Sequence, residues 1–224
     1  MVEWSIGAFG ACDSVRSIVV AVPPAHVDDL GGHDLAVVSG GATRAESVAN
    51  ALAAVGTGYV AIHDAARPLL TPALVEALIA DLDLNPEAAG VIAAAPVTDT
   101  IKRAAKFRGS FRTHSDRQEP RDEGSVSHGS FRTSGDRKEP QVVERTEDRT
   151  RLWAAQTPQV FRTEALREAL EAAERPQKAT DEAMLVEANG GVVLIHPVTV
   201  ENLKVTTPLD LRIAELLLQS RINT

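Results

Sequence analysis

The stretch Val60-Ala61-Ile62-His63-Asp64-Ala65-Ala66-Arg67-Pro68 decides how the fold of this chain is interpreted. Its first four residues are typical of a buried strand, which then ends in an acid, two small residues, an arginine and a proline. Ligands of open α/β sheets bind just beyond the carboxyl ends of the strands. Asp64 and Arg67 can therefore face one ligand, and the planar guanidinium group suits phosphate. The alternative is an ordinary strand end that carries a surface ion pair.

Length and composition fit a single globular domain, residues 1–224, in which 44% of the residues are hydrophobic. The net charge of −8 argues against a nucleic-acid partner, although a local basic pocket can still bind a small anion. The single cysteine, Cys12, excludes an intramolecular disulfide and suits a reducing compartment. We find no membrane-spanning run and no signal peptide, and we expect a cytoplasmic protein without a membrane partner.

Apolar runs and helical patterns alternate along the chain. Strands are predicted at residues 17–22, 35–38, 59–63, 90–95 and 192–195. Helices are predicted at residues 44–55, 162–174 and 181–188, and after the caps Thr71-Pro72 and Thr207-Pro208. Alternation of this kind favours an α/β fold with a parallel, doubly wound sheet.

Residues 107–141 break this pattern. They are rich in Arg, Asp, Glu, Ser and Gly, and they hold a near-duplicate at residues 109–120 and 129–140. Such a composition buries too little apolar surface to offset the entropy of ordering. We therefore interpret residues 107–141 as a flexible insertion; the alternative is a loop that docks a partner.

A second candidate ligand site is the stretch Gly40-Gly41-Ala42-Thr43-Arg44-Ala45-Glu46-Ser47, between a predicted strand and a predicted helix. Glycines allow a ligand to approach the backbone, and a helix N-terminus favours anions. Arg44 could meet a phosphate and Ser47 could donate a hydrogen bond. The alternative is a plain turn followed by a capped helix.

Positively charged side chains recur at the positions where an open sheet binds its ligand. Arg67, Arg149 and Lys204 all fall at strand ends or in loops, which predicts a small, multiply phosphorylated ligand. Gln156, Thr157 and Gln159 suit a pocket wall, whereas their neighbours Trp153 and Phe161 are most simply core anchors. No spacing of His and Cys suggests a metal site.

Together these motifs resemble the 2-C-methyl-D-erythritol 4-phosphate cytidylyltransferase family. The matching stretches occur in the order of the family and cover about residues 3–220 apart from the insertion. They are Gly40-Gly41 with Arg44 and Ser47, residues 63–68, Asp99-Thr100 with Lys102, Asp148-Arg149, Leu152-Trp153, and residues 156–159, 180–183 and 202–206.

The resemblance implies a Rossmann-like nucleotidyltransferase fold, that of the nucleotide-diphospho-sugar transferases, with a parallel-dominated sheet. It also implies a homodimer, with an arm at residues 99–106 and 142–146 that carries the insertion. The implied reaction joins CTP and methylerythritol phosphate and releases pyrophosphate, with Mg²⁺ bound mainly through the CTP phosphates.

Site residues are implied by the same resemblance. Gly41 and Ser47 would contact the cytidine part, and Asp64, Ala65 and Arg67 would lie between nucleotide and sugar phosphate. Arg149 and Lys204 would be the catalytic pair that holds and positions the attacking phosphate. The remaining residues expected at the methylerythritol phosphate site are Arg44, Thr100, Thr157 and Thr180.

The chain also departs from the family. Ala42 stands where an acid is common, and no stretch matches the first strand with its glycine-rich, triphosphate-binding loop. A missing first strand would leave two interior strands without a partner, so we expect poor stability and slow turnover. Two other functions remain open: a cytidylyltransferase for another polyol phosphate such as ribitol 5-phosphate, and a non-catalytic remnant that binds nucleotide weakly.

Overall fold

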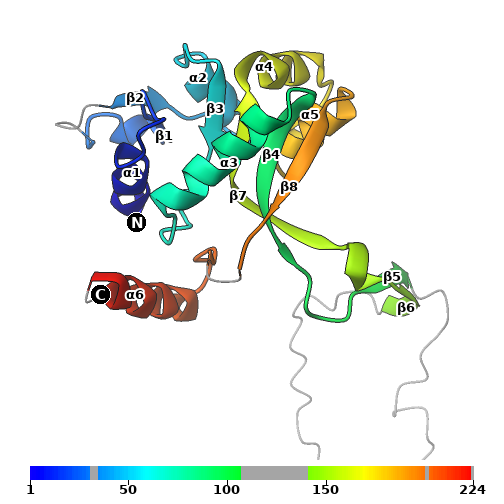
Figure 1. The fold of residues 1–224 in the computed structure, drawn as a ribbon. Coiled ribbons are helices and arrows are strands. Elements are labelled where there is room, and N and C mark those ends of the chain that lie inside the picture. Colours follow the sequence, from blue (N-terminus) through cyan, green and yellow to red (C-terminus); the bar gives the residue numbers. More distant parts are fainter. Residues whose placement is uncertain (31–34, 107–140, 200–201, 223–224) are drawn as a thin grey trace, which may run out of the picture. The chain divides into compact units, whose positions relative to one another are not determined.

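The computed structural model describes residues 1–30, 35–106, 141–199 and 202–222 of the 224 (Figure 1). The chain divides into two compact units: Met1–Pro96 with Trp153–Thr224, and Val97–Leu152. The predicted insertion lies outside the described residues apart from Gln141, the first residue of strand β6 (Gln141–Thr146).

The first unit contains the predicted helices and strands in their predicted order, together with a helix at Val2–Gly10 and a strand at Trp153–Arg162 that were not predicted. Its strands are β1 (Val19–Val22), β2 (Ala36–Ser39), β3 (Tyr59–Ile62), β4 (Ala88–Pro96), β7 (Trp153–Arg162) and β8 (Val192–Pro197). Its α-helices are α1 (Val2–Gly10), α2 (Arg44–Leu52), α3 (Pro72–Leu84), α4 (Thr163–Ala172), α5 (Glu182–Ala188) and α6 (Pro208–Ile222), with 3₁₀ turns at Pro24–His26 and Pro176–Lys178.

The sheets are mixed, so the expectation of a parallel-dominated sheet is met in part: β3, β4 and β8 run in one direction and β7 runs in the other. β1 pairs with β2 in parallel, and a separate four-stranded sheet has the order β3-β7-β4-β8. β7 runs antiparallel to both of its neighbours, while β4 and β8 are parallel. The chain leaves the sheet at the end of β4 and returns through β7 directly beside it, and adjacent strands joined in this way run in opposite directions.

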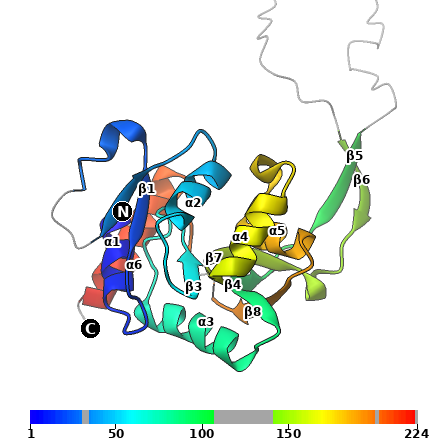
Figure 2. The same cartoon turned by 90° about the horizontal axis from the view of Figure 1, so that it is seen from above.

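Helices cover both faces of the four-stranded sheet (Figure 2). On one face, Leu78 and Leu82 of α3 pack against Val91 of β4. On the other face, Phe161 of β7 packs with Leu166 of α4 and with residues of α5. Because both faces are covered, β4 is apolar at nearly every position instead of alternating.

One close contact explains a glycine in the centre of this sheet. A Cβ atom on Gly90 would lie 2.3 Å from Cδ1 of Phe161, so the ring fits only over glycine. Phe161 is fully buried, as predicted for a core anchor. The same prediction is wrong for Trp153, which is 38% exposed because it sits at the first position of β7, outside the helix-covered part of the sheet.

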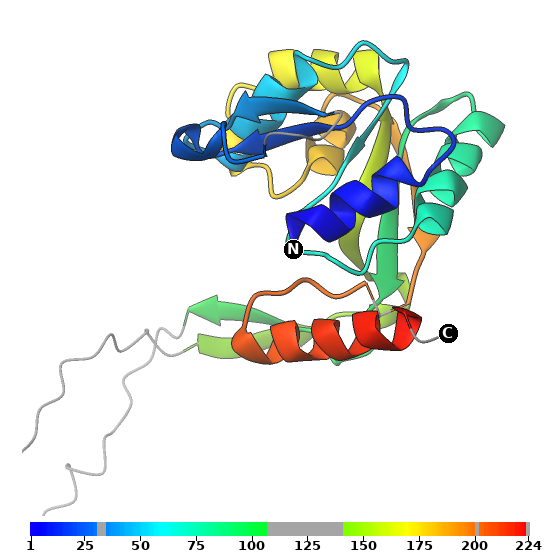
Figure 3. The ribbon, with the colours of Figure 1, turned by 90° about the vertical axis from the view of Figure 1, so that its left-hand side faces the viewer.

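The β1–β2 pair is less completely covered (Figure 3). Its register pairs Val19 with Ala36 and Val22 with Ser39. Residues of both strands are at most half-buried, although both strands are as apolar as β3. This pair therefore contributes little to the buried core.

The second unit is a β-ribbon. β5 (Lys102–Lys106) pairs with β6 in antiparallel register, and a 3₁₀ turn follows at Arg149–Arg151. Arg103 and Arg145 both donate to Oε1 of Glu147, at 2.6 and 3.0 Å. The residues expected in an arm, 99–106 and 142–146, thus form their own unit. Across the residues that the structure describes, no helix is both long and apolar enough to cross a membrane.

Candidate active site

The site is built around the turn that follows β3. The turn closes through a hydrogen bond from the Arg67 amide to the Asp64 carbonyl, 2.9 Å. The segment before α6 runs beside it: the Val205 amide donates to the Ala66 carbonyl at 2.8 Å. Nη1 of Arg67 donates to the Asn202 carbonyl at 2.7 Å. Two distant stretches singled out by the sequence are therefore joined by direct hydrogen bonds.

Asp64 is the centre of a cluster of positive charge. Its Oδ2 accepts from Nζ of Lys204 at 2.8 Å, and its Oδ1 lies 3.4 Å from Nη2 of Arg44. Burial acts to raise the pKa of Asp64, but Lys204, Arg44 and Arg67 outweigh it and hold that pKa below its ordinary value. The structure thus brings together four of the predicted residues, and three of them are cations.

Glu182 belongs to this cluster, although sequence reasoning did not assign it a role. Its Oε1 accepts from Nη1 of Arg44 at 2.5 Å, and the residue is 1% exposed. Burial raises the pKa of Glu182 despite its partner, while the same ion pair raises the pKa of Arg44 against the effect of burial. An acid in the first turn of a helix ordinarily suits the helix dipole, so its position in the chain does not indicate a buried ion pair.

His63 and Thr157 tie the strand end together. Nε2 of His63 lies 3.1 Å from the Arg67 carbonyl, and a carbonyl only accepts, so Nε2 carries the proton. Burial lowers the pKa of His63 to about 4, which keeps the ring neutral, so Nδ1 accepts from the Thr157 hydroxyl at 3.1 Å. The same hydroxyl accepts from the Asp64 amide at 3.0 Å. Thr157, predicted to bind substrate, therefore uses its hydroxyl to hold Asp64 in place.

The glycine loop before α2 is held by its own side chains. The Gly41 amide donates to Oγ of Ser47 at 3.1 Å, and that hydroxyl donates to the Thr43 carbonyl at 2.9 Å. A Cβ atom on Gly41 would lie 2.2 Å from Cβ of Glu46, so only glycine fits. Thr43 caps the helix by accepting from the Glu46 amide at 3.2 Å. These contacts are those of a turn with a capped helix, and the cytidine contacts of Gly41 and Ser47 stay predictions.

Other predicted residues lie around or away from this cluster. Ala65 is exposed in the turn, and Thr180 is exposed just before α5. Thr100 and Arg149 belong to the second unit, where Nη1 of Arg149 donates to the carbonyl of Thr98. Any approach of these two residues to Asp64 therefore stays a prediction.

Buried polar atoms without a partner surround the turn. Within the described part of the chain, Nε of Arg67, Oε1 of Gln156, Oε2 of Glu182 and Oδ1 of Asn202 make no hydrogen bond. Asn202 also donates to the Thr157 carbonyl at 2.8 Å, which links it to this group. A buried polar group without a partner is costly and needs an explanation. A hydroxyl-rich, anionic ligand would supply both the donors and the acceptors that these atoms lack.

Metal binding at the turn would rest on Asp64. Among the described residues, no group of three or more His, Cys, Asp and Glu side chains could hold a metal ion. Asp64 is a carboxylate at the turn, and both of its oxygens face cations. A Mg²⁺ ion that is held mainly by ligand phosphates needs only one carboxylate from the protein, and Asp64 could supply it only after Lys204 or Arg44 has moved away.

Comparisons with known proteins agree on one family. The family model described as 2-C-methyl-D-erythritol 4-phosphate cytidylyltransferase matches residues 1–122 and 131–220. The chain belongs to this family. The interval in the match, 123–130, falls within the predicted insertion. The cytidylyltransferase family comprises transferases of the non-mevalonate isoprenoid pathway, so the resemblance inferred from the motifs is confirmed.

Individual relatives extend over nearly the whole chain. A cytidylyltransferase of this name from Paraburkholderia phymatum is 36% identical, over 97% of this chain and 84% of its own length. A bifunctional enzyme IspD/IspF from Anaeromyxobacter sp. (strain Fw109-5) is 42% identical over 96% of this chain, which spans 49% of that relative. The chain thus spans about half the length of this bifunctional relative.

A solved structure supports the fold assignment. The crystal structure of the cytidylyltransferase from Thermus thermophilus superposes with a TM-score of 0.70. It is 29% identical, and the match covers 96% of this chain and 87% of the other. The α/β fold of the cytidylyltransferase family is therefore the fold of this chain, with mixed sheets.

Proposed function

We propose that this chain transfers a cytidylyl group from CTP to 2-C-methyl-D-erythritol 4-phosphate and releases pyrophosphate. Family membership supports this activity. One observation links this activity to particular residues. Arg44 and Lys204 contact Asp64, and Arg67 adds its positive charge from the same turn. Glu182 is paired with Arg44, so the cluster holds three cations and two carboxylates, and the remaining excess of positive charge suits a substrate that carries phosphates.

In the proposed reaction, a phosphate oxygen of methylerythritol phosphate attacks the α-phosphorus of CTP. The new P–O bond forms while the bond to the β-phosphate breaks, and pyrophosphate leaves with the electron pair. No covalent enzyme intermediate is required, so the protein acts by positioning the reactants and stabilising charge. Lys204 and Arg44 would transfer their hydrogen bonds from Asp64 to phosphate oxygens, with Arg149 holding the attacking phosphate.

A bound Mg²⁺ would neutralise phosphate charge and polarise the reacting phosphorus. Asp64 is the residue that would meet it, once Lys204 and Arg44 have turned to the phosphates. Gly41 and Ser47 would face the cytidine part, and the unpartnered atoms of Gln156 and Asn202 would accept hydrogen bonds from substrate hydroxyls.

We further infer a homodimer that is formed through the β5–β6 ribbon, and a cytoplasmic location. The ribbon exposes Val142 and Val143, which are 39% and 63% accessible. Exposed apolar side chains on a small ribbon suit burial against a second copy. The one cysteine, Cys12, is a free thiol, as is typical in a reducing compartment.

Pyrophosphate release by the purified chain with CTP, Mg²⁺ and methylerythritol phosphate tests the proposal. Lys204→Met is expected to lower kcat/KM by about 10²–10³, the usual effect of one lost electrostatic contact. Lys178→Met is the matched control, because Lys178 is an exposed lysine in a 3₁₀ turn of the same unit. This control should retain the activity of the unmodified chain.

Two outcomes would contradict the proposal. A higher kcat/KM with ribitol 5-phosphate would assign the chain to another polyol phosphate. Saturable binding of CTP without turnover would indicate a protein that binds nucleotide without catalysis.

A further inference from the structure

Glu182 occupies a fixed place at the start of α5. Gln159 of β7 holds the residues on either side of it: its Oε1 accepts from the Ala183 amide at 3.3 Å, and its Nε2 donates to Oδ2 of Asp181 at 3.1 Å. Asp181 also caps the helix by accepting from the Met184 amide at 3.0 Å. Gln159 is 1% exposed, so these contacts are shielded from water. The backbone at Glu182 is therefore fixed to the four-stranded sheet.

The guanidinium group of Arg44 bridges two acids unequally. Its Nη1 lies 2.5 Å from Oε1 of Glu182, and its Nη2 lies 3.4 Å from Oδ1 of Asp64. The Glu182 side chain is 2% exposed, whereas the Arg44 side chain is 39% exposed. Charge-assisted hydrogen bonds are strongest when they are short and shielded from water. Glu182 is therefore the anchor of Arg44, and Asp64 is its weaker contact.

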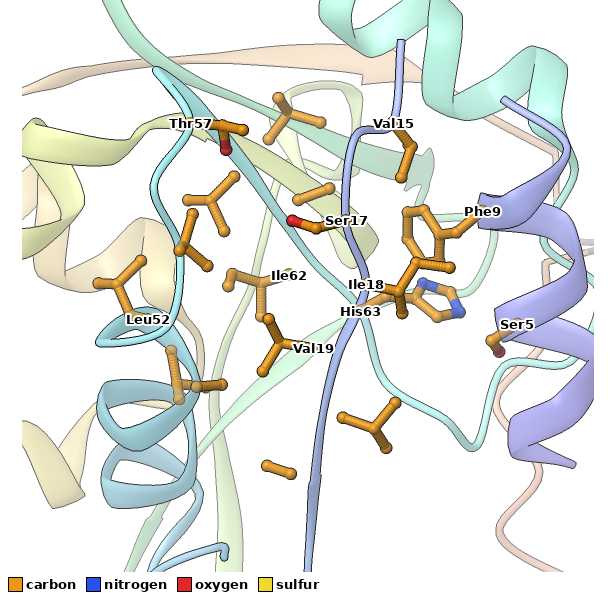
Figure 4. Close-up of a pocket in the computed structure, with 18 of the residues that line it drawn as sticks. Ser5, Phe9, Val15, Ser17, Ile18, Val19, Leu52, Thr57, Ile62 and His63 are labelled. Carbon is orange, nitrogen blue, oxygen red and sulfur yellow. The ribbon is translucent and has the colours of Figure 1, made fainter. Parts of the chain in front are cut away.

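Arg44 also reaches an open space. A cavity of about 720 Å³ extends along α2 and β3, and Figure 4 shows Leu52 and Ile62 on its walls. Arg44 and Asp64 line the same cavity, and Glu182 does not. The guanidinium group therefore contacts a buried acid and an accessible space at the same time. A ligand that enters this space can meet Arg44 without displacing Glu182.

Stability alone does not account for Glu182. Its second oxygen, Oε2, is buried and has no hydrogen-bond partner among the described residues. A buried ion pair adds little stability compared with neutral side chains, because both charges lose their hydration. A carboxylate with one unsatisfied oxygen adds less still. What the pair does provide is a fixed position for a long side chain that would otherwise be mobile.

A second effect of Glu182 concerns Asp64. Asp64 already accepts from Nζ of Lys204 at 2.8 Å, and its other oxygen lies within reach of Arg44. An arginine released from Glu182 would close on Asp64 with two nitrogens, because bidentate pairing with a carboxylate is favoured. Arg44 would then offer fewer donors to a ligand. Glu182 therefore divides the guanidinium group between two acids and keeps one of them from occupying it.

We propose that Glu182 is a positioning residue for anion binding, which holds the Arg44 guanidinium group at the candidate active site and keeps it from closing on Asp64. A guanidinium group that is held in advance loses less side-chain entropy when a phosphate arrives. The inference rests on the proposed function for the identity of the ligand, but its own claim is narrower. Glu182 strengthens the binding of a polyphosphate, and it does so only through Arg44.

Titration calorimetry of the full chain with inorganic tripolyphosphate tests the inference, because two effects of Glu182→Gln have opposite signs. Removal of a negative charge would strengthen anion binding, whereas loss of the anchor of Arg44 would weaken it. We expect binding that is weaker by about five- to tenfold, the cost of ordering one long side chain. Glu164→Gln is the matched control, because Glu164 lies in the first turn of α4 and pairs with Arg167 at 2.6 Å. This control should leave the affinity unchanged.

A double-mutant cycle shows whether Glu182 acts through Arg44. Arg44→Met should weaken tripolyphosphate binding by about tenfold or more, through the loss of a charged donor. Adding Glu182→Gln to Arg44→Met should cause no further loss, because the anchor then has nothing to hold. Glu182→Asp keeps the negative charge and shortens the side chain, so it should weaken binding by about threefold. The same variant carries the test if Glu182→Gln does not melt cooperatively.

Three results would overturn the inference. Unchanged or tighter binding by Glu182→Gln would show that the acid acts only by its charge or not at all. An equal loss with and without Arg44 would show that Glu182 supports the fold and not the guanidinium group. No tripolyphosphate binding by a parent chain that melts cooperatively would show that Arg44 is not an anion-binding group.

Release of pyrophosphate from CTP tests the proposed function separately. A chain without turnover whose tripolyphosphate binding needs both Glu182 and Arg44 would support this inference and contradict the proposed function. A chain with turnover whose tripolyphosphate binding is unchanged in Glu182→Gln would do the reverse.

Discussion

The four-stranded sheet and the β1–β2 pair are made from similar residues but are buried to different degrees. β4, with the sequence Ala-Ala-Gly-Val-Ile-Ala-Ala-Ala-Pro, is buried at seven of its nine positions. β1, with the sequence Val-Val-Ala-Val, has no fully buried residue. The difference comes from the neighbours: β4 has strands on both edges and helices on both faces, whereas β1 has one strand neighbour among those described. The burial of a strand therefore depends on the strands and helices beside it as much as on its own sequence.

The largest expected difference between the two regions is in the free energy of unfolding that is lost when a side chain is truncated. Phe161→Ala in the four-stranded sheet should lower the free energy of unfolding by about 3–5 kcal/mol, because the ring is fully buried. Val20→Ala in β1 should cost only about 1 kcal/mol, since that side chain is half-buried. Urea denaturation of both variants measures the two losses. Equal losses would show that the β1–β2 pair is as tightly packed as the central sheet.

A second test concerns the close contact at the centre of the sheet. Gly90→Ala places a methyl group 2.3 Å from the Phe161 ring, and we expect a loss of about 3 kcal/mol. Gly58→Ala is the matched control just before β3, where a Cβ atom meets nothing within 4 Å; it should change stability by less than about 1 kcal/mol. If the clash is the cause, adding Phe161→Leu to Gly90→Ala should cost less than the sum of the two single changes. If the two losses of stability simply add, the clash between residue 90 and the Phe161 ring is not the cause.

The third prediction concerns pH at the end of β3, where the two regions meet. Burial lowers the pKa of His63 from 6.5 to about 4, so the unfolded chain binds a proton more readily than the folded one. This contribution to stability is present above pH 6.5 and is lost as the pH falls toward 4. Between pH 7 and pH 5 the loss is about 2 kcal/mol.

His63→Gln is the variant that isolates this effect, because it keeps a polar side chain at the strand end and removes the titration. Unfolding measured in urea at pH 7, 6 and 5 should show a shallower pH dependence for His63→Gln than for the parent chain. The Phe9 ring, whose centroid lies 5.7 Å from the imidazole centroid at an interplanar angle of 77°, contributes to the burial. If the two chains have the same slope, another group is responsible for the pH dependence.

Local sequence predicted the elements well where caps and apolar runs coincide. Thr71-Pro72 predicted the start of α3, and its hydroxyl accepts from the Leu74 amide at 3.3 Å. β7 was the main element missed as a strand, because Gln156, Thr157 and Gln159 suggested a pocket wall. Those residues are polar because they hold the site together: Nε2 of Gln159 donates to Asp181 at 3.1 Å, and the Thr157 hydroxyl holds Asp64. Polar residues in a buried strand therefore indicate a functional site, and the same residues make the strand hard to predict from its hydrophobic pattern.

The site itself was predicted in part. Asp64, Arg67 and Lys204 were singled out at strand ends, and Arg44 in the glycine-rich stretch before a predicted helix. The structure brings these four residues together, and their roles toward a ligand stay predictions. Glu182 and Asn202 were not given roles, since their importance comes from burial next to residues about 140 positions away. Long-range pairing of that kind is not visible in a single sequence.

The smallest expected effect compares two threonine caps, one beside each sheet. Thr43 caps α2, which packs along β1 and β2, and Thr71 caps α3, which packs on the four-stranded sheet. Removing either hydroxyl with Thr43→Ala or Thr71→Ala should cost about 1 kcal/mol in global unfolding. Their hydrogen exchange should differ, because the less buried β1–β2 region is expected to open without global unfolding. Thr43→Ala should therefore speed exchange of α2 amides alone, whereas Thr71→Ala should speed exchange throughout the four-stranded sheet. The same exchange pattern in both variants would mean that the two regions unfold as one.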